Sequence, residues 1–190
     1  METVSGPQQH QSEGVDREPG EFDARSFRDV LGNFPTSVVA ITATGEGGRP
    51  EAMIVGSFTS VSLDPPLVSF LADRSSTTLG KILAAGQYCA NALAADQEGL
   101  CRRMAARGAD RFAGTGWRHS PLGNPVLDGV VGWVDCTIEK VVELGDHYLV
   151  VGRAVHLRTE SETTPLLFFR GDYGDYFSTT SLLLDRLTGW

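Results

Sequence analysis

Short runs of β-branched and apolar residues, separated by glycine- and proline-rich turns, recur along most of this chain. Runs of this length, bounded by turn residues, predict β-strands. The predicted strands cover residues 37–42, 52–57, 67–71, 88–93, 133–139, 147–155 and 166–169. Many strands joined by short turns favour a mainly β fold, an antiparallel barrel with peripheral helices, over a doubly wound parallel sheet.

The two longest runs indicate how the predicted sheet is built. Apolar and polar residues alternate over residues 133–139, which predicts a strand with one face in water. Residues 147–155 are almost continuously apolar and predict a central strand. Between the two runs, Glu143-Leu-Gly-Asp146 predicts a hairpin turn.

Three segments predict helices. The first begins at Asp23, a suitable N-cap, and ends at Gly32. The second covers residues 76–85 and ends at Gly86, and the third covers residues 96–107 with Asp96 as its N-cap.

Charge and cysteine content exclude several classes of function. The 190-residue chain has 16 Lys and Arg against 24 Asp and Glu, a formal net charge of −8, which argues against a nucleic acid or an anionic membrane as partner. Its three cysteines have no CxxC spacing, as in proteins that keep their thiols reduced. No apolar run is long enough for a transmembrane helix, and the N-terminus has no signal-peptide core. These observations predict a cytoplasmic protein.

The sequence predicts one folded domain with a tail at each end. Residues 1–20 are rich in Gln, Gly and Pro and predict a disordered N-terminal tail, because so few apolar residues cannot offset the entropy of ordering. Residues 21–178 form the predicted domain. Residues 179–190 are a predicted C-terminal tail, with a short helix as the alternative.

Common catalytic motifs are absent from the sequence. No GxGxxG follows a predicted strand, and there is no Walker A loop or GxSxG elbow. The four histidines lack the spacing of metal ligands, so no metal site is predicted.

Seven segments together resemble a known family. They are Phe34-Pro-Thr-Ser-Val38, Ser57-Phe-Thr-Ser-Val-Ser-Leu-Asp-Pro-Pro-Leu-Val68, Ser75-Ser-Thr-Thr78, Asn91-Ala-Leu-Ala-Ala-Asp-Gln97, Asp110-Arg-Phe112, Gly145-Asp-His147 and Pro165-Leu-Leu-Phe-Phe-Arg-Gly-Asp-Tyr173. In these segments, over about residues 24–176, the chain is similar to the flavin reductase domain family. That family comprises small NAD(P)H:flavin oxidoreductases with the antiparallel, Greek-key FMN-binding split barrel. One departure is Gly56, where many members have Asn or Ser.

The resemblance implies a homodimer that uses NADH to reduce FAD or FMN, with FAD as the first choice. The reduced flavin would pass to a separate flavin-dependent monooxygenase or halogenase. No basic cluster is placed for a 2′-phosphate, which favours NADH over NADPH. Two alternatives remain open. One is an enzyme that keeps its flavin as a prosthetic group and reduces its own small substrate, and the other is a non-catalytic flavin-binding protein.

The segment Ser57-Phe58-Thr59-Ser60 is the candidate for stabilising charge on the flavin ring. Negative charge develops on the N1–C2=O edge during reduction, and N–H and hydroxyl donors would stabilise it there. Taken alone, the segment is more simply a strand end entering a Pro-Pro turn.

The segment Ser75-Ser76-Thr77-Thr78 is the candidate for binding the flavin phosphate, with Lys81 adding charge one turn later. Free N–H groups and the positive end of the helix dipole suit an anion. The alternative is an ordinary N-cap.

His147 is the candidate catalytic residue. The resemblance implies that a neutral imidazole here lies at the nicotinamide and positions NADH, without being an obligate proton donor. Taken alone, Gly145-Asp-His147 is also an ordinary hairpin turn.

Further cofactor contacts are implied by the resemblance alone. For Gln97 a helix cap is the alternative, and for Arg111 and Phe112 a solvated arginine beside a packed ring is the alternative. The implied contacts are Thr36, Ser37, Asn91, Gln97, Phe112, Arg170 and Tyr173.

Overall fold

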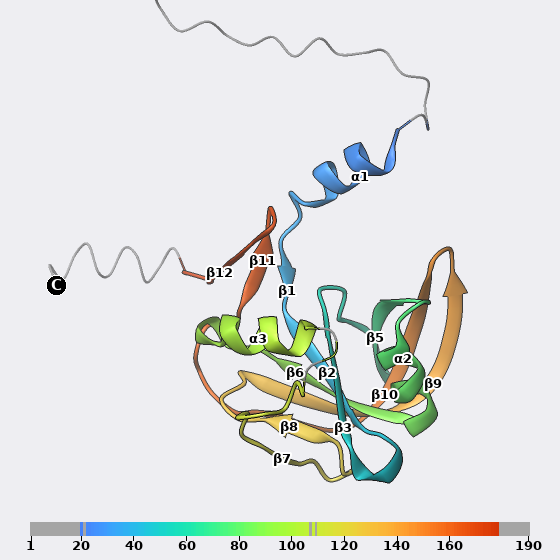
Figure 1. Cartoon of the computed structure of the whole chain (residues 1–190), viewed down its shortest axis with the longest axis vertical. Helices are drawn as coiled ribbons and strands as arrows, with labels where there is room; N and C mark the ends of the chain where they lie inside the picture. Colours follow the sequence, from blue (N-terminus) through green and yellow to red (C-terminus); the bar gives the residue numbers. More distant parts are fainter. Residues whose placement is uncertain (1–19, 21, 107, 109, 179–190) are drawn as a thin grey trace, which may run out of the picture.

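Seven antiparallel strands form the main sheet of the computed structural model, which describes residues 20, 22–106, 108 and 110–178 (Figure 1). Their order is β3-β2-β6-β9-β10-β5-β4. The sheet curls until β3 contacts β5, which gives the barrel. The strands are β2 (Val39–Thr44), β3 (Pro50–Val55), β4 (Thr59–Leu63), β5 (Pro66–Asp73), β6 (Gln87–Ala92), β9 (Gly132–Leu144) and β10 (His147–Thr159).

Two smaller sheets lie outside the barrel. One has the order β1-β11-β12, and the other is the hairpin β7-β8. Their strands are β1 (Thr36–Ser37), β7 (Trp117–His119), β8 (Pro125–Leu127), β11 (Leu167–Phe169) and β12 (Asp172–Gly174).

The described residues include three α-helices, of which two pack on the barrel. They are α1 (Ala24–Leu31), α2 (Thr77–Ala85) and α3 (Glu98–Ala105), and two short 3-10 turns are η1 (Glu46–Gly48) and η2 (Ala95–Gln97). Helix α2 packs on β2, β3 and β6, and α3 packs on β3. Helix α1 has no buried residue and projects away from the barrel (Figure 1).

Both faces of β2 are buried, so two cores meet along it. Val39 and Ile41 point to one core, where Phe70 and Tyr88 meet edge to face at 5.2 Å between ring centroids. Ala40 belongs to the other core, which lies under α3 and the β7-β8 hairpin. This double burial explains why the β2 sequence is apolar at nearly every position.

The predicted fold class is confirmed, and each predicted strand is present. The run at residues 37–42 divides at Val38 into β1 and β2. Val38 N–H donates to Leu166 O at 3.1 Å and so links the small sheet to the barrel. The sequence interpretation did not predict β4, β7, β8 or β12.

Two of the three helix predictions are confirmed, and the third needs correction. Asp23 Oδ1 accepts a hydrogen bond from Ser26 N–H at 2.7 Å, and α2 ends at Gly86, whose φ is +70°. The prediction that Asp96 caps the third helix is wrong, because the 3-10 turn η2 precedes α3 and contains Asp96. Instead, Gln97 Oε1 accepts from Ala94 N–H at 3.0 Å.

The predicted tails, residues 1–20 and 179–190, lie outside the described residues apart from Gly20. Within the described part of the chain, no helix is both long enough and apolar enough to span a membrane.

Candidate functional site

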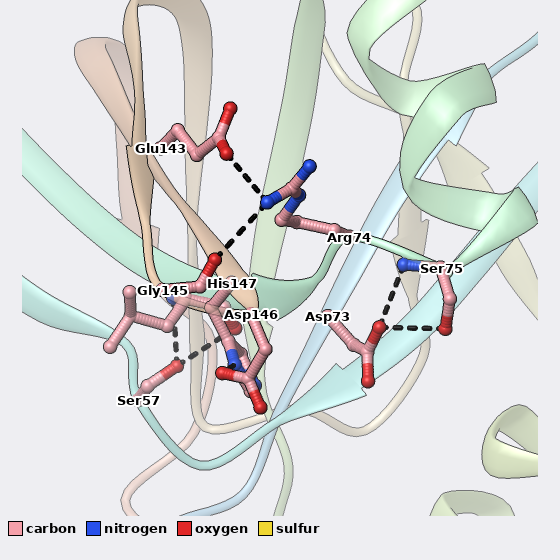
Figure 2. Close-up of polar contacts among 9 residues, drawn as sticks. Ser57, Asp73, Arg74, Ser75, Glu143, Gly145, Asp146 and His147 are labelled. Carbon is pink, nitrogen blue, oxygen red and sulfur yellow. Dashed lines mark hydrogen bonds and ion pairs between the residues drawn. The ribbon is translucent and has the colours of Figure 1, made fainter.

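The turn between β3 and β4 is tied to β5 by the Ser57 hydroxyl (Figure 2). Leu71 N–H donates to Ser57 Oγ at 2.9 Å, and Ser57 Oγ donates to Leu71 O at 3.1 Å. A serine hydroxyl has one hydrogen, so this oxygen cannot also donate to a ligand while the contact lasts. The Ser57 hydroxyl is therefore engaged within the fold, and the donor role of the backbone N–H groups and of Thr59 stays a prediction.

The other residues of this predicted segment divide between core and surface. Phe58 packs against the barrel core. Thr59 and Ser60 are exposed, and Thr59 Oγ1 is 3.4 Å from Ser60 O. Thr59 and Ser60, the first two residues of β4, therefore present exposed hydroxyls, whereas Ser57 is half-buried.

Thr36 and Ser37 line a hollow of about 180 Å³ together with Gly56, Phe168 and Tyr173. A Cβ atom on Gly56 would lie 2.8 Å from Thr36 Oγ1. The Thr36 side chain therefore fills the space that a side chain at Gly56 would need, which accounts physically for the glycine at this position.

Tyr173 closes one side of this hollow and is held by α3. Cys101 Sγ donates to Tyr173 Oη at 3.3 Å, and the Arg102 guanidinium lies 4.9 Å from the ring centroid. The hydrogen bond with Cys101 and partial burial raise the pKa of Tyr173 to about 12, so its hydroxyl is protonated at neutral pH.

The β9–β10 hairpin is fastened beside the start of α2. In the β5–β10 register, His147 is opposite Asp73, the last residue of β5. Arg74 N–H donates to Asp146 O at 3.1 Å, and the Arg74 guanidinium is 2.5 Å from Glu143 Oε1 (Figure 2). Segments about seventy residues apart in the chain therefore meet at one edge of the barrel.

His147 is oriented by its neighbour in the turn. Its Nδ1 lies 2.7 Å from Asp146 Oδ1, and this hydrogen bond lowers the pKa of the Asp146 carboxyl. A carboxylate only accepts, so Nδ1 carries the proton and Nε2 of the neutral ring is left as an acceptor. The His147 side chain is 42% exposed, which leaves it accessible to a ligand.

The N-terminus of α2 borders a cleft of about 390 Å³. Ser76 is the N-cap, and its Oγ accepts from Leu79 N–H at 3.2 Å. Thr77 and Thr78 begin the helix, so their N–H groups have no acceptor inside it. Such N–H groups with a positive dipole end fit a phosphate.

Ser75 contributes less to this cleft than its sequence position suggests. Its N–H and its Oγ both donate to Asp73 Oδ1, each at 2.7 Å (Figure 2). The groups left for an anion are the first-turn N–H groups and the hydroxyls of Ser76 and Thr77.

Arg111 joins three segments at the same cleft. Its Nη1 donates to Ala52 O and, at 3.0 Å, to Thr78 Oγ1, while its Nε donates to Ala106 O at 2.9 Å. The interpretation of a solvated Arg111 is therefore wrong. Phe112 is 8% exposed and meets Trp117 edge to face, as the packing alternative required.

Two predicted contacts, Asn91 and Gln97, line neither the hollow at Gly56 nor the cleft at the start of α2. Asn91 is fully buried, its Nδ2 is 3.0 Å from Thr42 Oγ1, and its Oδ1 accepts from Leu127 N–H at 2.9 Å. Gln97 Nε2 donates to Asp128 O at 2.8 Å, and Gln97 Oε1 accepts from Ala94 N–H, so both ends of the side-chain amide are engaged within the fold. We leave Asn91 and Gln97 out of the candidate site.

Arg170 and Lys81 have different surroundings. Arg170 Nε donates to Asn33 Oδ1 at 2.8 Å and connects the β11–β12 turn to the loop after α1. Lys81 lines a second cleft, where its Nζ is 2.7 Å from Glu51 Oε1. Its charge is therefore shared with a carboxylate.

Two residues of the site were missed in the sequence. Asp73 binds Ser75, and Arg49 lines the same cleft as Lys81. A single arginine after a Gly-Gly turn gives no signal, and only the β2–β3 pairing brings it beside α2.

Comparisons with known proteins agree on one family. Residues 31–176 match the family model described as a flavin reductase like domain. A flavin reductase from Pseudomonas putida is 51% identical over 155 residues, which cover 82% of this chain and 91% of the relative.

Two solved structures are also similar. Nitrilotriacetate monooxygenase component B from Mycobacterium thermoresistibile has 41% identity and a TM-score of 0.78, covering 80% of this chain and 86% of its own. An NADH:FAD oxidoreductase from Streptomyces globisporus, in complex with NAD and FAD fragments, has 30% identity and a TM-score of 0.77. The match covers 83% of this chain and 94% of the Streptomyces chain.

The Ser57 contact can be tested by its effect on stability. Replacing Ser57 with Ala removes both hydrogen bonds to Leu71, so we expect the free energy of unfolding in urea to fall by about 1–2 kcal/mol. Ser60→Ala is the matched control, since Ser60 is exposed on the adjoining strand β4, and should change the free energy of unfolding by less than about 0.5 kcal/mol. Equal effects of the two variants would contradict the assigned contact.

Proposed function

The chain belongs to the family of flavin reductase-like domains, and from this premise we propose that it is an NADH-dependent flavin reductase. It reduces FAD or FMN and releases the reduced flavin to a separate flavin-dependent monooxygenase or halogenase. One observation carries the proposal. The hairpin that bears His147 lies at the end of β5, beside the N-terminus of α2, whose free N–H groups fit a phosphate. A nicotinamide and a flavin must be held together for hydride transfer. This edge offers His147 for the nicotinamide and the N-terminus of α2 for the flavin phosphate.

The bound flavin supplies the hydride acceptor, its N5 atom, for the hydride that leaves nicotinamide C4. The protein's part is to bind and orient the two rings. The N–H groups of Thr77 and Thr78 and the Ser76 hydroxyl would hold the flavin phosphate, supported by the Arg111 charge. Backbone N–H groups of residues 57–60 and the Thr59 hydroxyl, which the Ser57 contact holds beside β5, would supply donors for the negative charge of a reduced flavin ring.

His147 orients the nicotinamide. With Nδ1 donating to Asp146, the acceptor Nε2 takes a hydrogen bond from the carboxamide N–H of NADH. The ionised Asp146 carboxylate favours the positive charge that forms on the nicotinamide ring as the hydride leaves. His147 therefore transfers no proton in the reaction.

Thr36, Ser37 and Tyr173 complete the flavin site in this proposal. The hollow that they line with Gly56 begins at the same turn that Ser57 fixes. Its aromatic and methyl surfaces suit the edge of a planar ring, and the two hydroxyls suit its polar atoms.

We also propose that the protein is a cytoplasmic homodimer. Phe27, Val30 and Leu31 on α1 are 49%, 61% and 47% exposed, and the edge strand β4 is exposed at nearly every residue. A second copy that covers these surfaces would remove both an apolar face and an open sheet edge. The three cysteines are free and buried, which suits a reducing compartment.

Light scattering tests the dimer. We expect a mass about twice the 20.4 kDa of one chain at micromolar concentration. A mass of one chain would contradict the dimer.

The reductase proposal predicts NADH oxidation that depends on added flavin. In air, the loss of NADH absorbance should be slow without flavin and should increase with FAD or FMN, because the product flavin leaves and is reoxidised. Activity of a yellow preparation without added flavin would favour an enzyme with a prosthetic flavin. No oxidation of NADH or NADPH under any condition would leave a binding protein and contradict the proposal.

The role of His147 predicts a particular kinetic change. His147→Ala should raise KM for NADH roughly tenfold and change kcat by less than about threefold, because it removes a binding contact and no proton donor. His156→Ala is the control, since His156 is exposed on β10 at the end away from the hairpin. A large loss of kcat at unchanged KM would assign His147 to the chemical step instead.

A further inference from the structure

The tip of the β9–β10 hairpin, which bears His147, has little support from the rest of the sheet. Strand β6 pairs with β9 only as far as Thr137, so residues 139–144 of β9 have β10 as their single strand neighbour in the described part of the chain. On the other side of β10, β5 ends at Asp73, opposite His147. The two turn residues, 145 and 146, lie beyond that last pair. Two strands without a third are marginally stable, so the tip depends on contacts of another kind.

The Arg74 side chain supplies such contacts on both sides of His147. Its Nη1 lies 2.5 Å from Glu143 Oε1 and donates to Gly145 O at 3.3 Å (Figure 2). Its guanidinium carbon lies 5.7 Å from the centroid of the Tyr148 ring, within the range of a cation–π contact. One side chain therefore contacts the end of β9, the turn and the start of β10.

The main chain of Arg74 holds only part of this tip. Its N–H donates to Asp146 O at 3.1 Å, which ties the turn to the residue after β5. Glu143 lies on β9, the strand without a second neighbour, and only the Arg74 guanidinium reaches it from β5. Loss of the side chain would leave the main-chain bond and the strand register in place, and would release the outer strand of the hairpin.

This contact contributes more to position than to stability. The Arg74 and Glu143 side chains are 45% and 56% exposed, and ion pairs in water add little to the stability of a fold. His147 follows the turn directly, and its Nδ1 is bonded to Asp146 Oδ1. A displacement of the turn would therefore carry the free Nε2 with it, and a shift of about 1 Å is enough to weaken a bound geometry.

We propose that Arg74 is a positioning residue for NADH. Its guanidinium fixes the tip of the hairpin, so that Nε2 of His147 stays in place for the carboxamide of the nicotinamide. Arg74 acts through His147 and contacts neither NADH nor the flavin. This inference rests on the proposed function, because it takes His147 as the group that orients the nicotinamide.

The test measures KM and kcat for NADH with excess FAD, and the dissociation constant of FAD by flavin fluorescence without NADH. Arg74→Ala should raise KM about threefold, as expected for loss of an exposed ion pair and a weak hydrogen bond. It should change kcat less than about 1.5-fold and FAD binding less than about twofold. Glu143→Gln removes the same ion pair from its other side and should raise KM in the same direction, whereas Arg74→Lys should recover part of the loss because it keeps the charge.

Arg153→Ala is the matched control. Arg153 Nε and Nη2 each lie 2.8 Å from an oxygen of Glu139, so the variant removes an ion pair between the same two strands. The Arg153 and Glu139 side chains are 41% and 37% exposed, and they lie away from the turn. KM for NADH should change less than about 1.5-fold. Equal rises in KM for Arg74→Ala and Arg153→Ala would overturn the inference, because they would reflect a general loss of positive charge toward an anionic nucleotide.

The double variant Arg74→Ala/His147→Ala separates positioning from direct contact. If Arg74 acts through His147, adding Arg74→Ala to His147→Ala should change KM less than about 1.5-fold further, because coupled residues are not additive. A second rise of about threefold would mean that Arg74 binds NADH itself, and the inference fails. It also fails if Arg74→Ala weakens FAD binding more than it raises KM for NADH.

Failure of the proposed function has a separate signature. In that case the unchanged protein does not oxidise NADH, or His147→Ala leaves KM unchanged. The inference alone fails if His147→Ala raises KM and Arg74→Ala does not.

Discussion

The pairing of β5 with β10 is the interaction on which the candidate site depends. Seven residue pairs, from Leu67 with Arg153 to Asp73 with His147, align the two strands in one register. A shift by one residue would turn the side chains of β10 to the opposite face. The register brings the end of β5, the start of α2 and the β9–β10 turn to one edge of the barrel, and His147 would not lie beside the start of α2 without it.

Polar side chains fix this edge more closely than strand pairing alone does. Arg74 holds the hairpin through Glu143 and Gly145 O, and Ser57 holds the β3–β4 turn against Leu71. Arg111 does the same for the loop after α3, by donating to the Ala52 carbonyl on β3 and to the Thr78 hydroxyl on α2. Catalysis by positioning needs binding groups that do not move relative to one another, and these contacts supply that rigidity from residues that need not touch the substrate.

All strands of the main sheet except β4, and two of the helix caps, could be predicted from the sequence, because β-branched runs and capping residues act locally. The roles of individual polar side chains could not. Ser57 and Ser75 occupy predicted flavin positions, yet each bonds to a main-chain or carboxylate partner that only the folded register supplies. Asn91 has a polar side chain in a strand, which suggested a ligand contact, but carbonyls of β2, β6 and β8 surround it. Arg49 gave no signal at all.

The central claim is that the protein reduces a flavin which then leaves it. The most direct measurement mixes the protein with NADH and an excess of FAD without oxygen, follows the loss of the visible flavin absorbance, and then passes the mixture through an ultrafiltration membrane. The account predicts complete bleaching of the excess flavin, with reduced flavin in the filtrate. Bleaching of no more than one flavin per protein chain, retained with the protein, would contradict it.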